Sequence, residues 1–392
     1  MYHFDYQGHT RGRLESYILM LIVFICVAGL RYRIGVDTTR YMQQYPALPD
    51  LIDYWSYDFD QTRYGRGYLL LNAVARSISD NFVVMQFLLA TFLNCVLFRF
   101  FYLNTGKIFF ALFLYFILQY FNYNFEILRE SCAISVFLFG WKYFYTNKLG
   151  KYYLICTLAV LFHPSALITF LLPLIKIPGF RKIFTINILT PLIIVSVLLA
   201  GIIISKIFFD WIRALEIASM DNYANIYENS HYAEDRDLNI YGLLTFFIKI
   251  FVYPLCCAWL ITNNKVVTFI HYDNIQYKAS LIGLFLCFVY ISTLSLSLQI
   301  LYRFTNYLAP FFILLFSDMI FHKIRFYHKR IRLSYGLWMA LMSPFLFLNI
   351  YGSFSPVGDS NTSKIHRYYP YASVISKETS RQRELLFYYE GL

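Results

Sequence analysis

Charged residues are scarce in this chain. Asp, Glu, Lys and Arg together make up 15% of the 392 residues, whereas a soluble globular protein carries about 25%. Hydrophobic residues make up 58% and come in blocks of about 15–25, the length that crosses a hydrocarbon core about 30 Å thick. The sequence therefore predicts an all-α polytopic integral membrane protein. The short alternating strands of a membrane barrel are missing as well.

Cysteines in polar loops are also lacking. All seven cysteines lie within apolar segments, at Cys26, Cys95, Cys132, Cys156, Cys256, Cys257 and Cys287. The sequence therefore predicts neither a disulfide framework nor a CxxC metal site, and we expect no cofactor. Neither an internal repeat nor a cleaved signal peptide is recognisable, so we expect the first apolar run, Ser16–Leu30, to be an uncleaved anchor.

The net charge of +11 does not indicate nucleic-acid binding, because the excess lies in short loops between apolar blocks. The positive-inside rule assigns such loops to the cytoplasm. This rule gives about eleven transmembrane helices in one domain, residues 1–350, with a cytoplasmic N-terminus. The predicted spans include Asn81–Leu103, Phe184–Ile207, Tyr241–Thr262 and Ser334–Ile350, and the most basic stretch, His322–Arg332, is assigned to the cytoplasm. Residues 31–80 and 208–240 become extracytoplasmic loops, and residues 351–392 an extracytoplasmic tail. In the first loop, Gly67–Ser79 is short and amphipathic, which is typical of a re-entrant or surface helix.

Unusual polar groups gather on the outer side of this map. They are Arg31, Arg33, Asp37 and Tyr41 after the first span, Glu126, Arg129 and Glu130 at a polar knee, His163 before the helix-breaking Pro164, Arg303 in a late span, and Tyr369 and Tyr371 in the tail. Charged groups at membrane depth are costly and usually face an interior cavity. Their occurrence on one side favours an outward-facing site for an anionic substrate.

Each group also has a purely structural explanation. Arg31 and Arg33 could anchor a helix end at the headgroups, and Arg303 could extend to the interface. The acids and the arginine of the knee, at i, i+3 and i+4 on one helical face, could form structural ion pairs. His163 could cap the broken helix. Lys249, in the middle of a predicted span, either pairs with an acid or reaches a lipid phosphate, and the sequence does not decide between these.

Short motifs follow one another along nearly the whole chain. They are Gly29-Leu-Arg31-Tyr-Arg-Ile-Gly35-Val-Asp37-Thr38, Gly67-Tyr-Leu-Leu-Leu-Asn72, Leu128-Arg129, Leu161-Phe-His163-Pro-Ser-Ala166, Tyr302-Arg303 and Tyr369-Pro-Tyr371. In this order they resemble the EpsG/Wzy type of bacterial polysaccharide polymerase. One departure is Tyr64-Gly65-Arg66, because that family has an acidic residue before the second motif. No catalytic acid is predicted there.

The resemblance implies a lipid-pyrophosphate-dependent glycosyltransferase of the bacterial inner (cytoplasmic) membrane, with a GT-C-like architecture. Such an enzyme polymerises oligosaccharide repeat units linked to undecaprenyl pyrophosphate into O-antigen, capsule or exopolysaccharide on the outer face. Membrane lipid and a chain-length regulator would be its partners. The alternatives are a lipid-linked oligosaccharide flippase or transporter, an O-antigen ligase, and a membrane acyltransferase that uses a membrane histidine.

The leaving group of this reaction is a lipid pyrophosphate, which the four arginines of the outer side would bind: Arg31, Arg33, Arg129 and Arg303. A guanidinium binds phosphate oxygens in bidentate fashion and stays protonated. The acceptor hydroxyl needs a base, for which His163 is the first candidate, followed by Glu130 and Asp37.

Aromatic side chains on the outer loops would stack on sugar faces, with Tyr41, Tyr369 and Tyr371 as the candidates. We expect no metal, because the arginines supply the positive charge. The competing metal hypothesis is the motif Asp58-Phe-Asp60, a D-x-D pair in an aspartate-rich loop.

Overall fold

The computed structural model describes residues 1–59, 62, 64–185, 190, 192–201, 248, 274–298, 301–320, 323–326, 329–354 and 363–389. The predicted loop 208–240 and Lys249 lie outside these residues, as do residues 186–189, 191 and 202–207 of one predicted span and all of the predicted span 241–262 except residue 248. The chain divides into two compact units. Unit 1 comprises Met1–Phe170 and Arg332–Leu392, and unit 2 comprises Leu171–Ile331. The tail therefore belongs to the same unit as the first spans.

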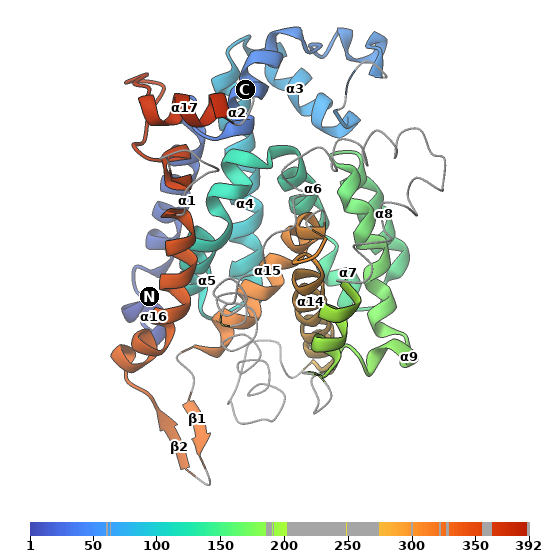
Figure 1. The fold of residues 1–392 in the computed structure, drawn as a ribbon, viewed down its shortest axis with the longest axis vertical. Coiled ribbons are helices and arrows are strands. Elements are labelled where there is room, and N and C mark those ends of the chain that lie inside the picture. The colour runs from blue at the N-terminus through green and yellow to red at the C-terminus, as the bar shows by residue number, and fades with distance from the viewer. Residues whose placement is uncertain are drawn as a thin grey trace. The chain divides into compact units, whose positions relative to one another are not determined.

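Unit 1 is built from helices (Figure 1). Its α-helices are α1 (Arg13–Gly29), α2 (Val36–Gln44), α3 (Arg66–Ile78), α4 (Phe82–Asn104), α5 (Ile108–Tyr115), α6 (Leu128–Leu138), α7 (Trp141–Tyr145), α8 (Leu149–Val160), α16 (Tyr335–Tyr351) and α17 (Arg381–Tyr389). Short π and 3-10 turns lie between them: η1 (Tyr2–Tyr6), η2 (Tyr45–Ala47), η3 (Asp53–Ser56), η5 (Phe116–Tyr120), η6 (Asn122–Glu126), η10 (Gly352–Phe354) and η11 (Lys364–Arg367). The 3-10 segment η7 (Pro164–Lys176) leads from unit 1 into unit 2.

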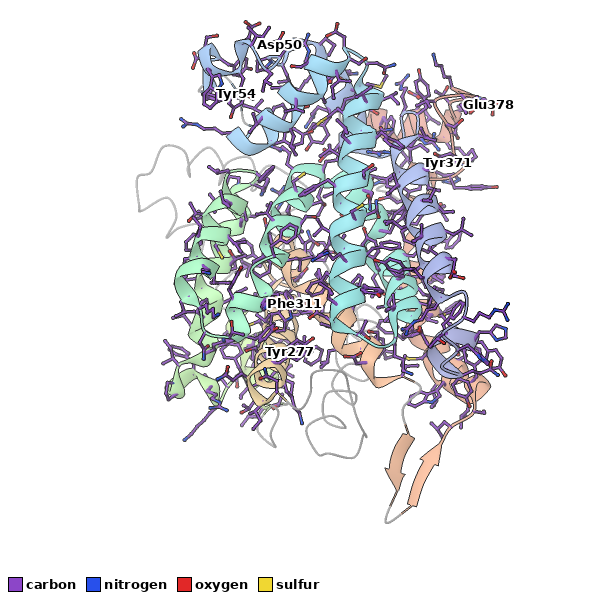
Figure 2. All side chains as sticks on the ribbon, turned by 180° about the vertical axis from the view of Figure 1, so that it is seen from behind. Asp50, Tyr54, Tyr277, Phe311, Tyr371 and Glu378 are labelled. Carbon is purple, nitrogen blue, oxygen red and sulfur yellow. The ribbon has the colours of Figure 1, made fainter. Side chains whose placement is uncertain are left out.

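Unit 2 contains α9 (Pro178–Arg181), α14 (Ile275–Leu294), α15 (Tyr302–Met319) and the strand β1 (Lys323–Phe326). Helices α14 and α15 pack along each other, with the rings of Phe288 and Phe312 4.8 Å apart; Figure 2 labels Tyr277 on α14 and Phe311 on α15. Strand β1 pairs with β2 (Lys329–Arg332). Apart from this hairpin, the elements of the described residues are helical, as predicted. The hairpin forms in the most basic stretch, where a helix would bring like charges together at i, i+3 and i+4.

Among the described residues, two helices are individually long and apolar enough to cross a membrane, α4 with 23 residues and α14 with 20. Shorter apolar helices accompany them, at Ile108–Tyr120, Leu149–Val160, Pro164–Lys176, Leu192–Gly201 and Tyr335–Tyr351. These helices point to a membrane protein. The count of about eleven spans stays a prediction, because most of residues 202–273 lie outside the described part of the chain.

Long-range hydrogen bonds gather several predicted outer segments at one end of unit 1. The Gln86 amide, in the second turn of α4, donates to the carbonyls of Gly29 and Arg31 at 2.8 and 2.9 Å. The Thr38 hydroxyl of α2 donates to the Phe125 carbonyl of η6 at 2.8 Å. In Figure 1, α2, α3 and α17 all lie at this end of the long helices. We call it the capped end; it comprises residues 31–59, 62, 64–80, 122–130, 161–165 and 363–387.

The tail wraps the capped end. It forms a β-bridge between Ser373 and Arg31, and the Val374 amide donates to the Leu30 carbonyl at 2.9 Å. Arg383 of α17 is buried and donates to the carbonyls of His366 and Pro370. Figure 2 places Tyr371 and Glu378 of the tail at the same end as Asp50 and Tyr54 of the first loop. Residues 363–387 of the tail therefore form a strap across the first loop, and we call this segment the strap.

The N-terminus lies at the opposite end of unit 1, where α4 turns into α5. The Asp5 carboxylate accepts a hydrogen bond from the Phe110 amide at 2.7 Å, and Arg13 donates to the Gly106 carbonyl at 3.0 Å. The Tyr6 hydroxyl donates to the Leu333 carbonyl just before α16. Residues 1–13 and the capped end are thus on opposite ends of the helices. Which end faces the cytoplasm stays a prediction.

Neutralising Asp5 is expected to stabilise the protein at neutral pH. Burial raises the pKa of this carboxyl from 3.8 to about 6, against the lowering effect of the Phe110 amide bond. Because the folded-state pKa is raised, the stability that Asp5 contributes is complete below pH 3.8 and is lost as the pH rises through 6. Asp5→Asn keeps an oxygen acceptor for Phe110 and should add about 1–3 kcal/mol at pH 8 but little near pH 4. Unfolding temperatures of the purified protein at the two pH values measure this; an equal change at both contradicts it.

Candidate functional site

A tight turn connects α1 to α2 and depends on glycine. Gly35 has φ +91°, and a Cβ built on it would lie 2.4 Å from the Phe125 carbonyl oxygen. A side chain is therefore excluded here both by backbone conformation and by contact with η6. The turn brings the start of α2 directly against the knee, which positions Asp37, Thr38 and Tyr41 beside the start of α6.

Arg31 stabilises this turn from inside. The residue is 2% exposed, and its guanidinium donates to the carbonyls of Ala28 and Ile34 and to the Thr38 hydroxyl. It also lies 4.7 Å from the centre of the Phe125 ring. Burial lowers the pKa of Arg31 to about 10, so that it remains a cation at neutral pH. These bonds give Arg31 a structural role; pyrophosphate binding by Arg31 stays a prediction.

Arg33 has a different environment. Its guanidinium forms an ion pair with Glu384 of α17 at 3.1 Å, and about a third of its side chain is exposed. The pair connects the turn to the strap. A partly exposed ion pair contributes little stability, about 0–1 kcal/mol. Arg33 can therefore exchange Glu384 for another anion at little cost.

Arg129, the second residue of α6, is enclosed by three tyrosines that come from two other helices and a loop. Its Nε donates to the Tyr41 hydroxyl at 3.1 Å, and its guanidinium lies 5.0 Å from the Tyr64 ring centre and 5.9 Å from that of Tyr41. The rings of Tyr41, Tyr64 and Tyr68 lie 5.6–6.0 Å apart. We call these four residues the Arg129 cage. Cation–π contacts and the Nε bond hold the planar guanidinium in one orientation.

The hydroxyls of the cage remain protonated donors. Burial raises the pKa of Tyr41 to about 12 despite the nearby Arg129, and the Tyr64 hydroxyl donates to Gln44. The Tyr68 hydroxyl is buried, and no described residue is its hydrogen-bond partner. Unpartnered buried hydroxyls are rare in native proteins and call for an explanation. Tyr64 and Tyr68 are not among the site residues predicted from the sequence, although Tyr68 lies in the Gly67–Asn72 motif and Tyr64 just before it.

The helix break at His163 packs against the segment that carries Tyr64. A Cβ built on Gly65 would lie 2.4 Å from the Leu161 carbonyl oxygen, and the Gly67 amide donates to the same carbonyl at 2.8 Å. The first turn of α3 thereby satisfies a carbonyl that the helix break leaves unpaired. Residues 64–67 therefore contact Arg129 on one side and the His163 turn on the other. Two motifs about 95 residues apart in sequence form one junction.

The His163 ring is oriented by Ser165. The Ser165 amide donates to the ring Nδ1 at 3.2 Å, and the Ser165 hydroxyl lies 2.6 Å from the same nitrogen. A backbone amide can only donate, so Nδ1 is the acceptor. In the neutral ring the proton is then on Nε2. This arrangement makes His163 a hydrogen-bond donor through Nε2 rather than an acceptor.

The two predicted carboxylates differ in burial. Asp37 lies in the first turn of α2, is half-buried and acts electrostatically on Tyr41, the partner of Arg129. Glu130, the third residue of α6, is buried. Glu126 lies against Tyr368 of the strap. Among these acids, Asp37 combines proximity to the Arg129 cage with partial exposure.

The comparison with known protein families decides the family. A family model described as the EpsG family matches residues 16–373. The chain belongs to the EpsG family. Neither a curated protein nor a solved structure matches it. Membership indicates a membrane-bound, glycosyltransferase-like role in polysaccharide polymerisation, and the matched region contains both the Arg129 cage and the His163 turn.

The remaining predicted site residues of this EpsG-family chain belong to α15 and to the strap. Arg303 is exposed on α15 in unit 2, and its place in the site stays a prediction. Tyr369 and Tyr371 are both exposed in the strap, and the Tyr371 hydroxyl donates to the Val27 carbonyl of α1. Asp60 of the D-x-D motif lies outside the described residues. Within the part of the chain that the structure describes, no group of three His, Cys, Asp or Glu side chains could hold a metal ion.

Proposed function

We propose that this EpsG-family protein polymerises oligosaccharide repeat units carried on undecaprenyl pyrophosphate, at the capped end and on the outer face of the bacterial inner membrane. The observation that carries the proposal is the Arg129 cage beside the His163 turn. A pre-oriented guanidinium and a ring N–H at one junction match the charge of a lipid-pyrophosphate leaving group. A family whose role is polymerisation needs such a site.

Arg129 would stabilise the leaving group. The bond between the sugar anomeric carbon and the phosphate oxygen breaks, and its electron pair leaves with the lipid pyrophosphate. A guanidinium already fixed by its aromatic neighbours loses little side-chain freedom when it binds the developing anion. The N-terminal end of α6, where Arg129 lies, adds positive potential. Electrostatic stabilisation of this kind is commonly the largest catalytic contribution.

His163 and Asp37 would share the remaining work. His163, donating from Nε2, would bind a pyrophosphate oxygen. Asp37 would accept the proton of the acceptor sugar hydroxyl as the new glycosidic bond forms between that oxygen and the anomeric carbon. This assignment gives the role of base to a carboxylate, because the Ser165 amide opposes an acceptor role for the ring.

Two substitutions of His163 distinguish a donor from a base. His163→Gln places an amide N–H near the position of Nε2 but cannot accept a proton at neutral pH. If the ring is a donor, the glutamine variant should lose about tenfold in rate and the alanine variant about 100-fold or more. Chain growth by each purified variant is the measurement. Equal losses in both variants would return His163 to the role of base.

Removing the Tyr68 hydroxyl is expected to separate stability from activity. Tyr68→Phe deletes a buried hydroxyl without a described partner and should stabilise the ligand-free protein by about 1–3 kcal/mol. If that hydroxyl donates to the bound substrate, the same change should slow chain growth several-fold. Unfolding temperature and rate are measured on one preparation. Tyr54→Phe serves as control, because the Tyr54 hydroxyl already donates to the Arg66 carbonyl. If Tyr68→Phe is more stable than the wild type but extends chains at the same rate, the Tyr68 hydroxyl is only a packing defect.

The reaction itself is tested with purified protein and lipid-linked repeat units, without nucleotide sugars. Polymer formation supports the proposal. In cells, deletion of the gene should leave single repeat units on the carrier or on the lipid A core. Units trapped on the inner leaflet would instead indicate a flippase, and long polymer on the carrier that is never transferred to lipid A core would indicate a ligase.

A further inference from the structure

The capped end exposes an apolar surface that the proposed reaction does not use. Tyr68, Leu69 and neighbouring residues make up the buried face of α3. The opposite, exposed face of this helix is apolar as well. Together with the loop before it, this face presents six exposed hydrophobic side chains: Leu51, Ile52, Trp55, Leu70, Val74 and Ile78. We call this surface the η3–α3 platform. Exposed apolar patches of this kind mark interaction sites.

The six side chains form one surface because η3 runs alongside α3. The Leu51 amide donates to the Ser77 hydroxyl at 3.0 Å, and Ser77 follows Val74 by one turn. At the other end of the helix, the Tyr54 hydroxyl donates to the Arg66 carbonyl at 3.0 Å. Trp55 packs edge-on against the Tyr54 ring, 5.2 Å between centres. Leu70, Val74 and Ile78 lie four residues apart and therefore share one helical face.

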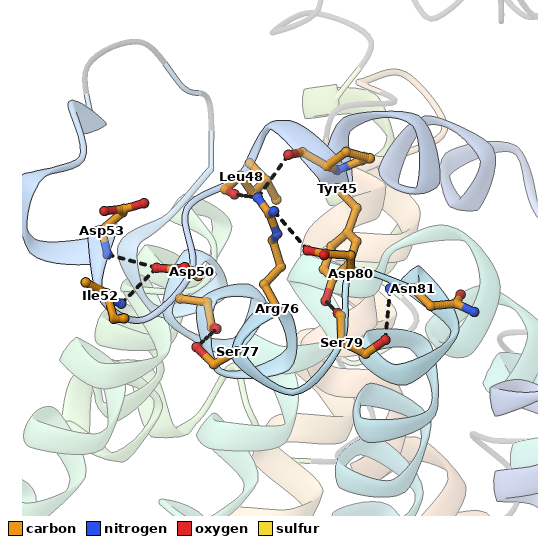
Figure 3. Close-up of polar contacts among 12 residues, drawn as sticks. Tyr45, Leu48, Asp50, Ile52, Asp53, Arg76, Ser77, Ser79, Asp80 and Asn81 are labelled. Carbon is orange, nitrogen blue, oxygen red and sulfur yellow. Dashed lines mark hydrogen bonds and ion pairs between the residues drawn. The ribbon is translucent and has the colours of Figure 1, made fainter.

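Hydrogen bonds hold this loop in place (Figure 3). The Asp50 carboxylate accepts from the amides of Ile52 and Asp53, both at 2.9 Å. Arg76 donates to the carbonyls of Pro46 and Leu48 and pairs with Asp80. Even so, Ile52 is 87% exposed and Trp55 83% exposed. Because these hydrogen bonds fix the loop, its apolar side chains stay directed outward. We therefore expect membrane lipid or another molecule to cover them.

We propose that the η3–α3 platform rests on the lipid leaflet at the capped end, with Leu51, Ile52 and Trp55 at the boundary between headgroups and acyl chains. Only three residues separate Ile78 from Phe82, where the membrane-spanning α4 begins. Helix α4 also carries exposed apolar side chains in its first two turns, among them Phe87 and Leu88. Tryptophan favours the headgroup level, and amphipathic helices of this type lie in the interface plane.

The aliphatic side chains argue against a glycan as the occupant. Ile52, Val74 and Ile78 offer sugars neither a hydrogen bond nor a flat face for stacking. A lipid contact of the platform would position the Arg129 cage relative to the membrane. The buried face of α3 contributes Tyr68 to the Arg129 cage, so a lipid contact on the opposite face sets the depth of the cage near the phosphates. The lipid contact itself does not depend on the proposed reaction.

The test uses the full chain in nanodiscs that hold one copy each. The contribution of Trp55 is the difference between the fluorescence of the wild type and of Trp55→Phe. Lipids brominated at a shallow acyl position are expected to quench this difference signal at least twofold, and more than lipids brominated near the chain ends. Ile52→Glu should weaken that quenching. Ile375→Glu, at an equally exposed residue of the strap (88%), should leave it unchanged.

Several results overturn the proposal. One is a Trp55 signal that aqueous iodide quenches and brominated lipid does not. Another is protection from iodide only when soluble oligosaccharide is added, which would assign the platform to glycan. A third is lipid quenching that appears only with two copies in each disc, which would assign it to self-association. If Ile52→Glu fails to fold, the comparison of wild type with Trp55→Phe still decides. Loss of polymerisation in His163 or Arg129 variants has no bearing on these measurements.

Discussion

Replacing Arg129 by alanine is expected to reduce glycan chain growth by roughly 100-fold or more, with normal insertion into the membrane. The guanidinium is the one charged group of the Arg129 cage, held by the Tyr41 hydroxyl at 3.1 Å and by the Tyr64 ring at 5.0 Å. Its removal leaves the developing pyrophosphate without its pre-oriented partner. Arg129→Lys keeps the charge but loses the planar fork and the Nε donor, so it should show an intermediate loss.

The measurement is the initial rate of polymer formation by purified variants, normalised to protein in the membrane. Arg99→Ala provides a matched control, because Arg99 is an exposed arginine of α4 and should show the wild-type rate. Tyr41→Phe keeps the ring and removes the hydroxyl, and should cost less than the loss of Arg129. A fully active Arg129→Ala protein would remove the cage from the active site and leave the tyrosines a packing role.

Placing a methyl group on Gly35 is expected to destabilise unit 1 more than any single change at a surface loop. The residue has φ +91°, and the new Cβ would lie 2.4 Å from the Phe125 carbonyl oxygen and 3.0 Å from its carbon. Left-handed backbone costs an alanine about 1–2 kcal/mol, and forcing η6 away adds about 1–3 kcal/mol. Gly35→Ala should therefore lose roughly 2–5 kcal/mol.

Thermal unfolding in detergent measures this loss. Gly150→Ala is the control, since nothing lies within 4 Å of a Cβ at that position of α8; alanine should stabilise the helix there by up to about 1 kcal/mol. Activity supplies a second readout, because displacing η6 moves the start of α6 and with it Arg129. Unchanged stability in Gly35→Ala would show that the turn adapts and that the junction of α2 with η6 is soft.

Local sequence signals predicted the long apolar helices well. The predicted span Asn81–Leu103 corresponds to α4 (Phe82–Asn104), and Ser334–Ile350 corresponds to α16 (Tyr335–Tyr351). In both cases the boundary residue is a side-chain cap: Asn81 accepts from the Val83 amide, and Ser334 from the Leu337 amide. The short amphipathic segment Gly67–Ser79, which the sequence separates from the spans, corresponds to α3 (Arg66–Ile78).

Irregular backbone was less predictable. The sequence predicts that the basic stretch His322–Arg332 is cytoplasmic but gives no sign of the β1–β2 hairpin that it contains. The knee was placed correctly in the chain, but the π turns η5 and η6 before it, and the 3-10 course of η7 after His163, were not foreseen. A hydropathy block of the right length accommodates α, π or 3-10 hydrogen bonding, and the choice depends on packing against neighbouring helices.

The sequence by itself determined which segments are apolar helices, where the chain must turn, and that Arg31, Arg129 and His163 are unusual polar residues beside apolar runs. Only the tertiary structure decided that Arg31 is directed inward while Arg129 lies in a tyrosine cage. The deciding contacts join residues 87 and 88 positions apart, Thr38 to Phe125 and Arg129 to Tyr41. Hydropathy and periodicity are properties of neighbours in the chain, whereas the partner of a buried cation is chosen by helix packing.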